Sequence, residues 1–380
     1  MMDTGREHLT RRSFLAASCG LAASCGAPGL KSRRRAGEPA PVAAVITEYR
    51  RNSHADVIVG RMLQGYEYYG EFRKPRVRVV AMYTDQVPKN DLSREMAARH
   101  GVRIAPTIAD AVAPGGKLAV EGVVIVGEHG NYPYNEKGQH LYPRYELFQR
   151  TVECFLAAGE TVPVFCDKHL SYDWEKARRM YDWSKKPGFP FLAGSSVPLA
   201  WRHPPVEIEH GARIDHAVTV FYGGKESYGF HALEALECMV ERRAGGETGV
   251  AAVRCVEGPE VWEWTSSHAW AGPLLETALS RCPNRKPGSP RDTVKAPILF
   301  EIEYSDGLRA AVYLLNGHVE TTGFAASVRG AAEPVSTEMW LQPARPFSHF
   351  SGLVYHIEEM MVTGKAPYPA ERTLLTTGML

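Results

Sequence analysis

The chain has 380 residues, of which 44% are hydrophobic and 23% are charged, and its formal net charge at pH 7 is +1. A chain of this length can bury two separate cores, and the composition is ordinary for a globular protein. The nearly balanced charge gives no reason to expect nucleic acid or an acidic surface as a partner. No apolar run reaches the length of about eighteen residues that a membrane span needs. The cysteines show no CxxC spacing, so neither a metal site nor a disulfide scaffold is predicted.

The first 40 residues are predicted to be a targeting segment and a linker rather than part of the fold. Thr10-Arg-Arg-Ser-Phe-Leu15 opens an apolar, small-residue run that ends near Gly29, and together they resemble a twin-arginine export signal. Lys31 to Pro39 follows as the linker. The sequence therefore predicts a periplasmic or secreted protein that is exported by the twin-arginine machinery.

Residues 41–194 alternate between buried strands and helices, which favours a Rossmann-like doubly wound parallel sheet. The strand-like runs have few polar residues, as expected for strands buried on both faces. The predicted strands are Val42–Ile46, Val77–Tyr83, Glu121–Val126, Val164–Cys166 and Phe191–Gly194, and the predicted helices are Asp91–His100, Ile108–Val112, Pro143–Ala158 and Tyr172–Lys185.

The turn after the first strand lacks the glycines of a dinucleotide-binding fingerprint. It reads Thr47-Glu-Tyr-Arg-Arg-Asn-Ser-His54, and Glu48 would place a negative charge where phosphates bind. Arg50 and Arg51, with the start of the following helix near Asn52 or Ser53, could still hold an anion. Asn52 and Ser53 are therefore candidate cofactor-binding residues, although nucleotide binding at this turn is in doubt.

Other candidate cofactor residues follow the next strands. Asp85 ends the second strand, where a carboxylate can bind an adenosine ribose, although an isolated Asp there is as often a cap. Glu128 and His129 lie near the start of the loop Gly127–Tyr134, which follows the predicted strand Glu121–Val126. This loop could line a cleft or simply cover the edge of the sheet.

Asp167, Lys168 and His169 lie directly after the buried strand at 164–166. Open α/β sheets bind ligands at the carboxyl ends of their strands. A lysine there can donate a proton or hold a substrate oxygen. The alternative is a solvated loop lysine that pairs with Asp167.

The second half, residues 195–380, is predicted to be an α+β domain with a largely antiparallel sheet and helices on one face. Its strands include Arg213–Tyr222 and a hairpin of 298–304 with 308–315, and its helices include Gly229–Val240 and Gly352–Val362. A sheet covered on one side only would expose an apolar face, so a homo-oligomer is expected.

His231 and Glu234 lie three residues apart on the Gly229–Val240 helix and so share one face. A histidine whose tautomer is fixed by a carboxylate suits proton transfer or hydroxyl binding. The alternative is a histidine near the helix start that is hydrogen-bonded to backbone.

These motifs together resemble the glucose-fructose oxidoreductase / inositol dehydrogenase / MocA (Gfo/Idh/MocA) family over about residues 42–380. Cys166-Asp-Lys-His-Leu170 is similar to the family's Glu-Lys-Pro motif, and the resemblance implies that Lys168 is catalytic. Gly229-Phe-His-Ala-Leu-Glu234 is similar to its Gly-x-His-x-x-Asp helix, which implies substrate-site roles for His231 and Glu234. Val123–Val126 and Gly364–Gly378 match further family segments. Members are usually NAD(P)-dependent oxidoreductases of sugars and cyclitols.

The sequence thus predicts an exported oxidoreductase-like protein that acts on a sugar or sugar-like polyol, with Lys168 as the acid/base group. Asp167 replaces the family's Glu and joins the candidate cofactor contacts. If the reaction is redox, NAD or NADP would have to bind without the glycine turn and tightly enough to survive export, so the NAD(P) site is predicted to be tightly bound or degenerate. Two alternatives stay open. One is a non-redox lyase or epimerase that uses the same Lys/His cleft, and the other is a carbohydrate-binding protein without catalysis.

Overall fold

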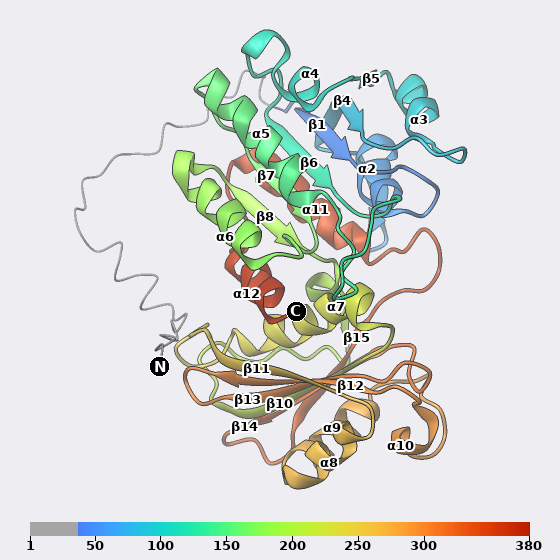
Figure 1. Cartoon of the computed structure of the whole chain (residues 1–380), viewed down its shortest axis with the longest axis vertical. Coiled ribbons are helices and arrows are strands. Elements are labelled where there is room, and N and C mark those ends of the chain that lie inside the picture. Colours follow the sequence, from blue (N-terminus) through green and yellow to red (C-terminus); the bar gives the residue numbers. More distant parts are fainter. Residues whose placement is uncertain (1–36) are drawn as a thin grey trace, which may run out of the picture. The chain divides into compact units, whose positions relative to one another are not determined.

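The computed structural model describes residues 37–380, which form two compact units (Figure 1). The Rossmann-like unit contains the described residues up to Leu199 and then Gln342–Gly378, and the mixed-sheet unit contains Ala200–Leu341 and Met379–Leu380. The predicted twin-arginine motif lies outside the described residues. Within residues 37–380, no helix has both the length and the apolar character to span a bilayer.

The Rossmann-like unit is built on a six-stranded sheet with the strand order β5-β4-β1-β6-β7-β8, and every neighbouring pair is parallel. Its strands are β1 (Ala40–Ile46), β4 (Val77–Thr84), β5 (Arg103–Ile104), β6 (Gly122–Val126), β7 (Val164–Asp167) and β8 (Phe191–Gly194). All residues of β6 and β7 are buried, as expected for central parallel strands. The predicted doubly wound sheet is confirmed.

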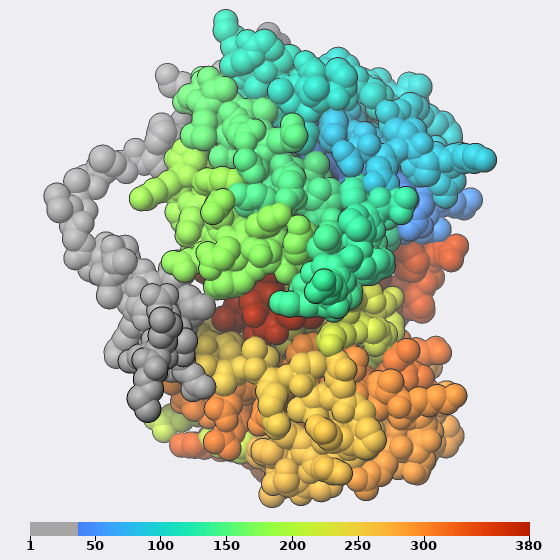
Figure 2. All heavy atoms as spheres, viewed as in Figure 1, coloured from blue at the N-terminus to red at the C-terminus, as the bar shows by residue number. Residues whose placement is uncertain are grey.

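Helices cover both faces of this sheet. Successive residues of a strand point to opposite faces, so alternate residues join two separate cores. Val123 and Ile125 face the core under α4 (Ile108–Val112), α5 (Arg144–Ala158), α6 (Trp174–Trp183) and the start of α12 (Glu371–Met379). Val124 and Val126 face the core under α2 (His54–Gln64), α3 (Ser93–His100) and α11 (Phe350–Thr363). In the space-filling view, the green atoms of α5 and α6 hide much of the sheet (Figure 2).

Helix α11 belongs to this unit, whereas all of 195–380 was predicted to lie in the second domain. Leu353 and Ile357 of α11 join the same core as Ile58 of α2. A Cβ atom at Gly122 would lie 2.1 Å from Met361 Sδ, so glycine is what lets α11 approach β6 so closely. The division differs from the predicted one because the apolar face of α11 matches the core of the first sheet.

Several short elements complete the unit. A hairpin of β2 (Tyr66–Tyr68) and β3 (Glu71–Arg73) separates α2 from β4. One-turn helices occupy Pro114–Gly116 and Val197–Leu199, and a π-helical turn, Ser184–Gly188, extends α6. None of these was predicted from the sequence.

The mixed-sheet unit has a seven-stranded sheet with the order β11-β12-β13-β10-β14-β15-β9. Only β10 and β13 pair in parallel, so the predicted, largely antiparallel sheet is confirmed. The strands are β9 (Trp201–His203), β10 (Ile214–Phe221), β11 (Val250–Glu257), β12 (Ile298–Tyr304), β13 (Arg309–Leu314), β14 (Thr322–Val328) and β15 (Val335–Trp340).

This second sheet carries helices on both faces, so the expectation of helices on one face only is wrong. On one face, the Phe221 ring lies 6.2 Å from the ring of Tyr228 and 6.4 Å from that of His231, both in α7 (Lys225–Val240). On the other face, Val218 and Val220 share a core with α8 (Glu260–Ser267) and α9 (Ala271–Leu279). A short helix, α10 (Pro290–Thr293), precedes β12.

Candidate functional site

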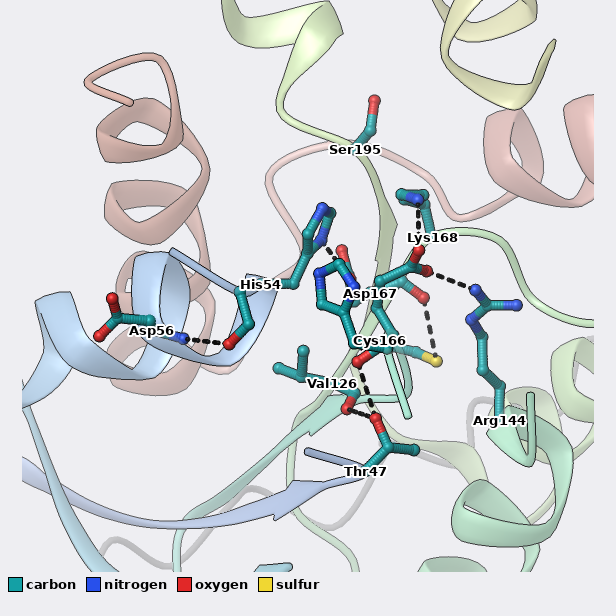
Figure 3. Close-up of polar contacts among 12 residues, drawn as sticks. Thr47, His54, Asp56, Val126, Arg144, Cys166, Asp167, Lys168 and Ser195 are labelled. Carbon is teal, nitrogen blue, oxygen red and sulfur yellow. Dashed lines mark hydrogen bonds and ion pairs between the residues drawn. The ribbon is translucent and has the colours of Figure 1, made fainter. Parts of the chain in front are cut away.

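The candidate site lies at one edge of the Rossmann-like sheet, where β1, β6 and β7 end. These three strands are neighbours and parallel, so their carboxyl ends meet at the same edge. Thr47 follows β1, Gly127 follows β6, and Lys168 follows β7. Figure 3 shows the polar side chains that gather at this edge.

Lys168 belongs to a buried cluster of three charged groups. Its Nζ lies 3.2 Å from Oε1 of Glu128, and Nη2 of Arg144 donates to Oε2 of the same carboxylate at 2.6 Å. Lys168 is 6% exposed and Arg144 is 2% exposed. Lys168 is therefore not a solvated loop lysine paired with Asp167, because its ionic partner is Glu128.

The electrostatics of this cluster favour the ionised carboxylate. Burial alone would raise the pKa of Glu128, but the nearby Lys168 and Arg144 charges hold this pKa well below its usual range. Gly127 makes the pairing possible, since a Cβ atom there would lie 2.6 Å from Cγ of Arg144. Glu128 is thus a permanent anion between two cations.

His54 and Asp167 form a second polar pair at the same edge. His54 is the first residue of α2, and its Nδ1 lies 2.7 Å from Oδ2 of Asp167. Asp167 is fully buried, and its Oδ1 atom has no hydrogen-bond partner among the residues that the structure describes. Nε2 of His54 likewise makes no hydrogen bond with any residue from 37 to 380, and the His54 side chain is 16% exposed.

His129 lies beside both clusters. Nη2 of Arg50 donates to its Nδ1 at 3.1 Å, and its ring stands edge-on to His54 with the centroids 5.5 Å apart. Burial, followed by the nearby His54, lowers the pKa of His129 to about 4. The imidazole is therefore neutral at physiological pH, as a ring that accepts a hydrogen bond from Arg50 must be.

The turn between β1 and α2 is closed by its own side chains. Oγ of Ser53 accepts hydrogen bonds from the backbone N–H of Arg50 at 3.2 Å and of Asp56 at 3.3 Å. Oδ2 of Asp56 accepts from the backbone N–H of Asn52 at 2.8 Å. The backbone N–H groups of Arg50, Asn52 and Asp56 are thus already paired, and Asp56 adds a negative charge at the start of α2.

Glu48 and Thr47 occupy the rest of this turn. Glu48 is buried and pairs with Nε of Arg50 at 2.5 Å. The Thr47 hydroxyl lies 2.8 Å from the carbonyl oxygen of Glu128, to which it donates, and 3.3 Å from that of Val126. The turn is therefore fastened to the end of β6.

The other predicted site residues, Asp85, His231 and Glu234, do not belong to these two clusters. Both oxygens of Asp85 accept hydrogen bonds from tyrosines, Tyr83 at 2.9 Å and Tyr132 at 2.7 Å, so this carboxylate anchors the loop after β6. His231 and Glu234 lie in α7 of the mixed-sheet unit, where Glu234 is buried and His231 is partly buried. Among residues 37–380, no group of three His, Cys, Asp or Glu side chains is arranged to hold a metal ion.

His54 and Arg144 are the two residues of the site that sequence reasoning missed. Each starts a helix directly after a loop at the carboxyl edge of the sheet. A search for polar residues at the starts of helices, rather than only at the ends of strands, would have found both. Their partners, Asp167 and Glu128, were predicted, but as contacts to a cofactor.

Comparison with known proteins gives the fold. No protein-family model matches the sequence, and no curated protein matches it significantly. Among solved structures, GenD2 from gentamicin A biosynthesis, in complex with NAD, superimposes with a TM-score of 0.52 at 14% identity, over 91% of this chain and 93% of that one.

Two further structures agree. A Gfo/Idh/MocA family oxidoreductase from Vibrio cholerae has a TM-score of 0.52 at 12% identity, over 90% of this chain and 95% of that one. Myo-inositol 2-dehydrogenase from Lactobacillus plantarum has a TM-score of 0.50 at 11% identity, over 90% of this chain and 94% of that one. The chain therefore has the fold of the Gfo/Idh/MocA oxidoreductases, and the resemblance in sequence is confirmed at the level of the fold.

Proposed function

We propose that this protein is an enzyme that acts on a sugar or sugar-like polyol, with Lys168 as the group that exchanges a proton with a substrate oxygen. The observation that carries the proposal is the buried Lys168–Glu128–Arg144 cluster at the carboxyl edge of the sheet. The fold adds support, because one protein that shares it is a dehydrogenase of myo-inositol.

The cluster suits Lys168 to this task. The Lys168 ammonium group forms an ion pair with Glu128 at 3.2 Å and has three N–H donors. These donors would hold a substrate hydroxyl or carbonyl oxygen. Arg144 also pairs with Glu128, so this carboxylate has two counter-ions. Glu128 can therefore position Lys168 while Arg144 balances its negative charge. Lys168 would hold the oxygen and stabilise negative charge that develops on it.

The fold implies NAD or NADP, but the residues at the β1–α2 turn do not fit a dinucleotide in the usual pose. The pyrophosphate needs free backbone amides at the start of the helix and room for close approach. Here Ser53 and Asp56 occupy amides of the turn, and Glu48 and Asp56 would repel phosphates. No step of the proposed chemistry is therefore assigned to nicotinamide.

This misfit favours the redox-neutral alternative, a lyase or an epimerase, over a dehydrogenase that binds a dissociable cofactor. Asn52, Ser53, Asp85 and Asp167, proposed from the sequence as cofactor contacts, all have partners within the protein. The substrate-site roles of His231 and Glu234, which lie in the mixed-sheet unit, stay predictions. Export by the twin-arginine route is also part of the proposal.

The test is turnover of myo-inositol, D-glucose, D-fructose and D-glucuronate, followed by NMR. The proposal expects at least one compound to be converted, and Lys168→Met to lower the rate by about 10²-fold or more. The control is Lys185→Met, which removes an exposed lysine of the same unit that pairs with Glu371. No turnover of any compound, or a Lys168→Met rate within about threefold of wild type, would refute the assignment.

A further inference from the structure

We propose that His54 is a second proton-transfer residue, oriented by Asp167, and that the enzyme moves a proton at a carbon atom next to a substrate carbonyl. This inference rests on the proposed function and narrows it to a redox-neutral reaction of a carbonyl-bearing sugar. The pair connects the first helix of the unit with the end of β7, and no sequence motif predicted it.

The geometry of the pair is that of an oriented base. The 2.7 Å contact fixes the proton of the neutral imidazole on Nδ1, because an ionised carboxylate can only accept. Nε2 then carries the lone pair. Because Nε2 has no partner within residues 37–380 and the side chain is partly exposed, this lone pair is available to a substrate.

A contact that only stabilised the fold would not require a buried carboxylate at Asp167. A fully buried carboxylate is costly, and one whose second oxygen lacks a partner is costlier still. A serine or asparagine could tie the start of α2 to the end of β7 at lower cost. An aspartate is needed when the imidazole must hold one tautomer and gain a proton during reaction.

His54 and Lys168 are placed to act on one molecule. Asp167 and Lys168 are consecutive residues at the end of β7, so the two clusters meet there (Figure 3). Nζ of Lys168 lies 3.2 Å from Glu128, and the next residue, His129, stands edge-on to His54 with the ring centroids 5.5 Å apart. A substrate carbonyl held by Lys168 would thus bring its adjacent C–H bond near Nε2 of His54.

The reaction balances without an oxidant. Nε2 of His54 removes the proton of the C–H bond, and the electron pair of this bond forms the C=C bond of an enolate, whose oxygen Lys168 stabilises. Delivery of a proton from solvent to the carbon from the other side inverts the centre, and His54 then releases its proton to solvent. Alternatively, departure of a β-hydroxyl as water consumes a proton and gives an unsaturated product. No hydride is transferred in either case.

The test is exchange of hydrogen for deuterium at carbon when D-fructose, D-glucose or D-glucuronate is incubated with the protein in D₂O, read by NMR. Wild type is expected to label the position next to the carbonyl of at least one probe. His54→Gln is expected to lower the labelling rate by about 10²–10⁴-fold. Imidazole added to His54→Ala is expected to restore part of it. The control is His356→Gln, a histidine of α11 that pairs with Glu359.

Asp167→Asn separates catalysis from structure, since the amide oxygen can still accept from Nδ1 of His54. The proposal expects labelling to fall by about 10²-fold or more while the melting temperature stays near that of wild type. Labelling that is unaffected by His54→Gln would overturn the inference. Lys168-dependent turnover without any labelling would overturn it too, but would leave the proposed function intact. Absence of both turnover and deuterium labelling would refute the proposed function as well.

Discussion

Nδ1 of His54 lies 2.7 Å from Oδ2 of Asp167, although 113 positions separate the two residues in the sequence. The contact joins the first turn of α2 to the end of β7 at the edge where a doubly wound sheet binds its ligands. Beside it, Glu128 holds Lys168 and Arg144. An edge that serves cofactor binding in related folds thus carries a His–Asp pair and a Lys–Glu–Arg cluster here.

Glu128→Gln should destabilise the protein more than Lys168→Met. Removing Glu128 leaves two buried cations without their counter-ion, which costs about 3–5 kcal/mol. Removing Lys168 leaves Glu128 paired with Arg144 at 2.6 Å, so most of the compensation stays. Urea unfolding of both variants measures the difference. Equal losses, or a larger loss for Lys168→Met, would contradict this account of the cluster.

Glu358 should make the stability fall as pH rises. Burial raises its pKa to about 7 from the ordinary 4.5, even though Tyr66 donates a hydrogen bond to it at 2.9 Å. The folded protein therefore holds a proton that the unfolded chain releases above pH 4.5, and the contribution is lost as pH rises towards 7. The free energy of unfolding should fall by about 3 kcal/mol across this window.

Glu358→Gln is the control for this pH dependence, because a glutamine keeps the hydrogen bond with Tyr66 but cannot ionise. Urea unfolding of wild type and variant at several pH values gives the comparison. The free energy of unfolding of Glu358→Gln, relative to that of wild type, should increase from pH 4.5 to 7. A gap that does not change with pH would show that Glu358 is not protonated in the folded state.

If the protein forms the expected homo-oligomer, the chains should pair through the edge of the second sheet and not through its face. Both faces carry helices, but β11 is an edge strand of eight residues whose side chains are mostly exposed, Val253 among them. Long exposed edges favour pairing with another chain. Light scattering should give a multiple of the chain mass, and Val253→Glu should shift it towards the monomer. A monomeric wild type would contradict the expectation.

The twin-arginine proposal has a direct test. The export machinery reads the paired arginines, Arg11 and Arg12, so replacing both with lysine should retain the protein in the cytoplasm. Fractionation of cells that produce each form measures this. Replacing Arg33 and Arg34 in the linker with lysine is the matched control and should leave export unchanged. Equal amounts of both forms in the periplasm would refute the proposal.

The sequence predicted the first sheet well because its strands are buried on both faces and read as uninterrupted apolar runs. β6 and β7 were placed within one residue at either end. It misjudged the carboxyl-terminal region, since the apolar face of α11 indicates burial but not which core receives it. Helices α8 and α9 were missed, and this led to the wrong expectation of an open sheet face.

The candidate site was predicted in part for a similar reason. Lys168 and Asp167 follow a clear strand, so their place at the sheet edge could be inferred. The partners of these residues could not, because the approach of Arg144 depends on Gly127 and the approach of His54 depends on the fold of the β1–α2 turn. Contacts between residues far apart in the chain come from packing, which local patterns do not record.

Native mass spectrometry of protein purified without added nucleotide, and then titrated with NAD and NADP, tests the central claim most directly. If the β1–α2 turn is closed by Ser53 and Asp56, the protein should carry no dinucleotide. It should also bind either one more weakly than about 1 mM, which corresponds to a binding free energy of roughly 4 kcal/mol. A retained dinucleotide, or half-saturation in the micromolar range, would contradict the redox-neutral account and favour a dehydrogenase.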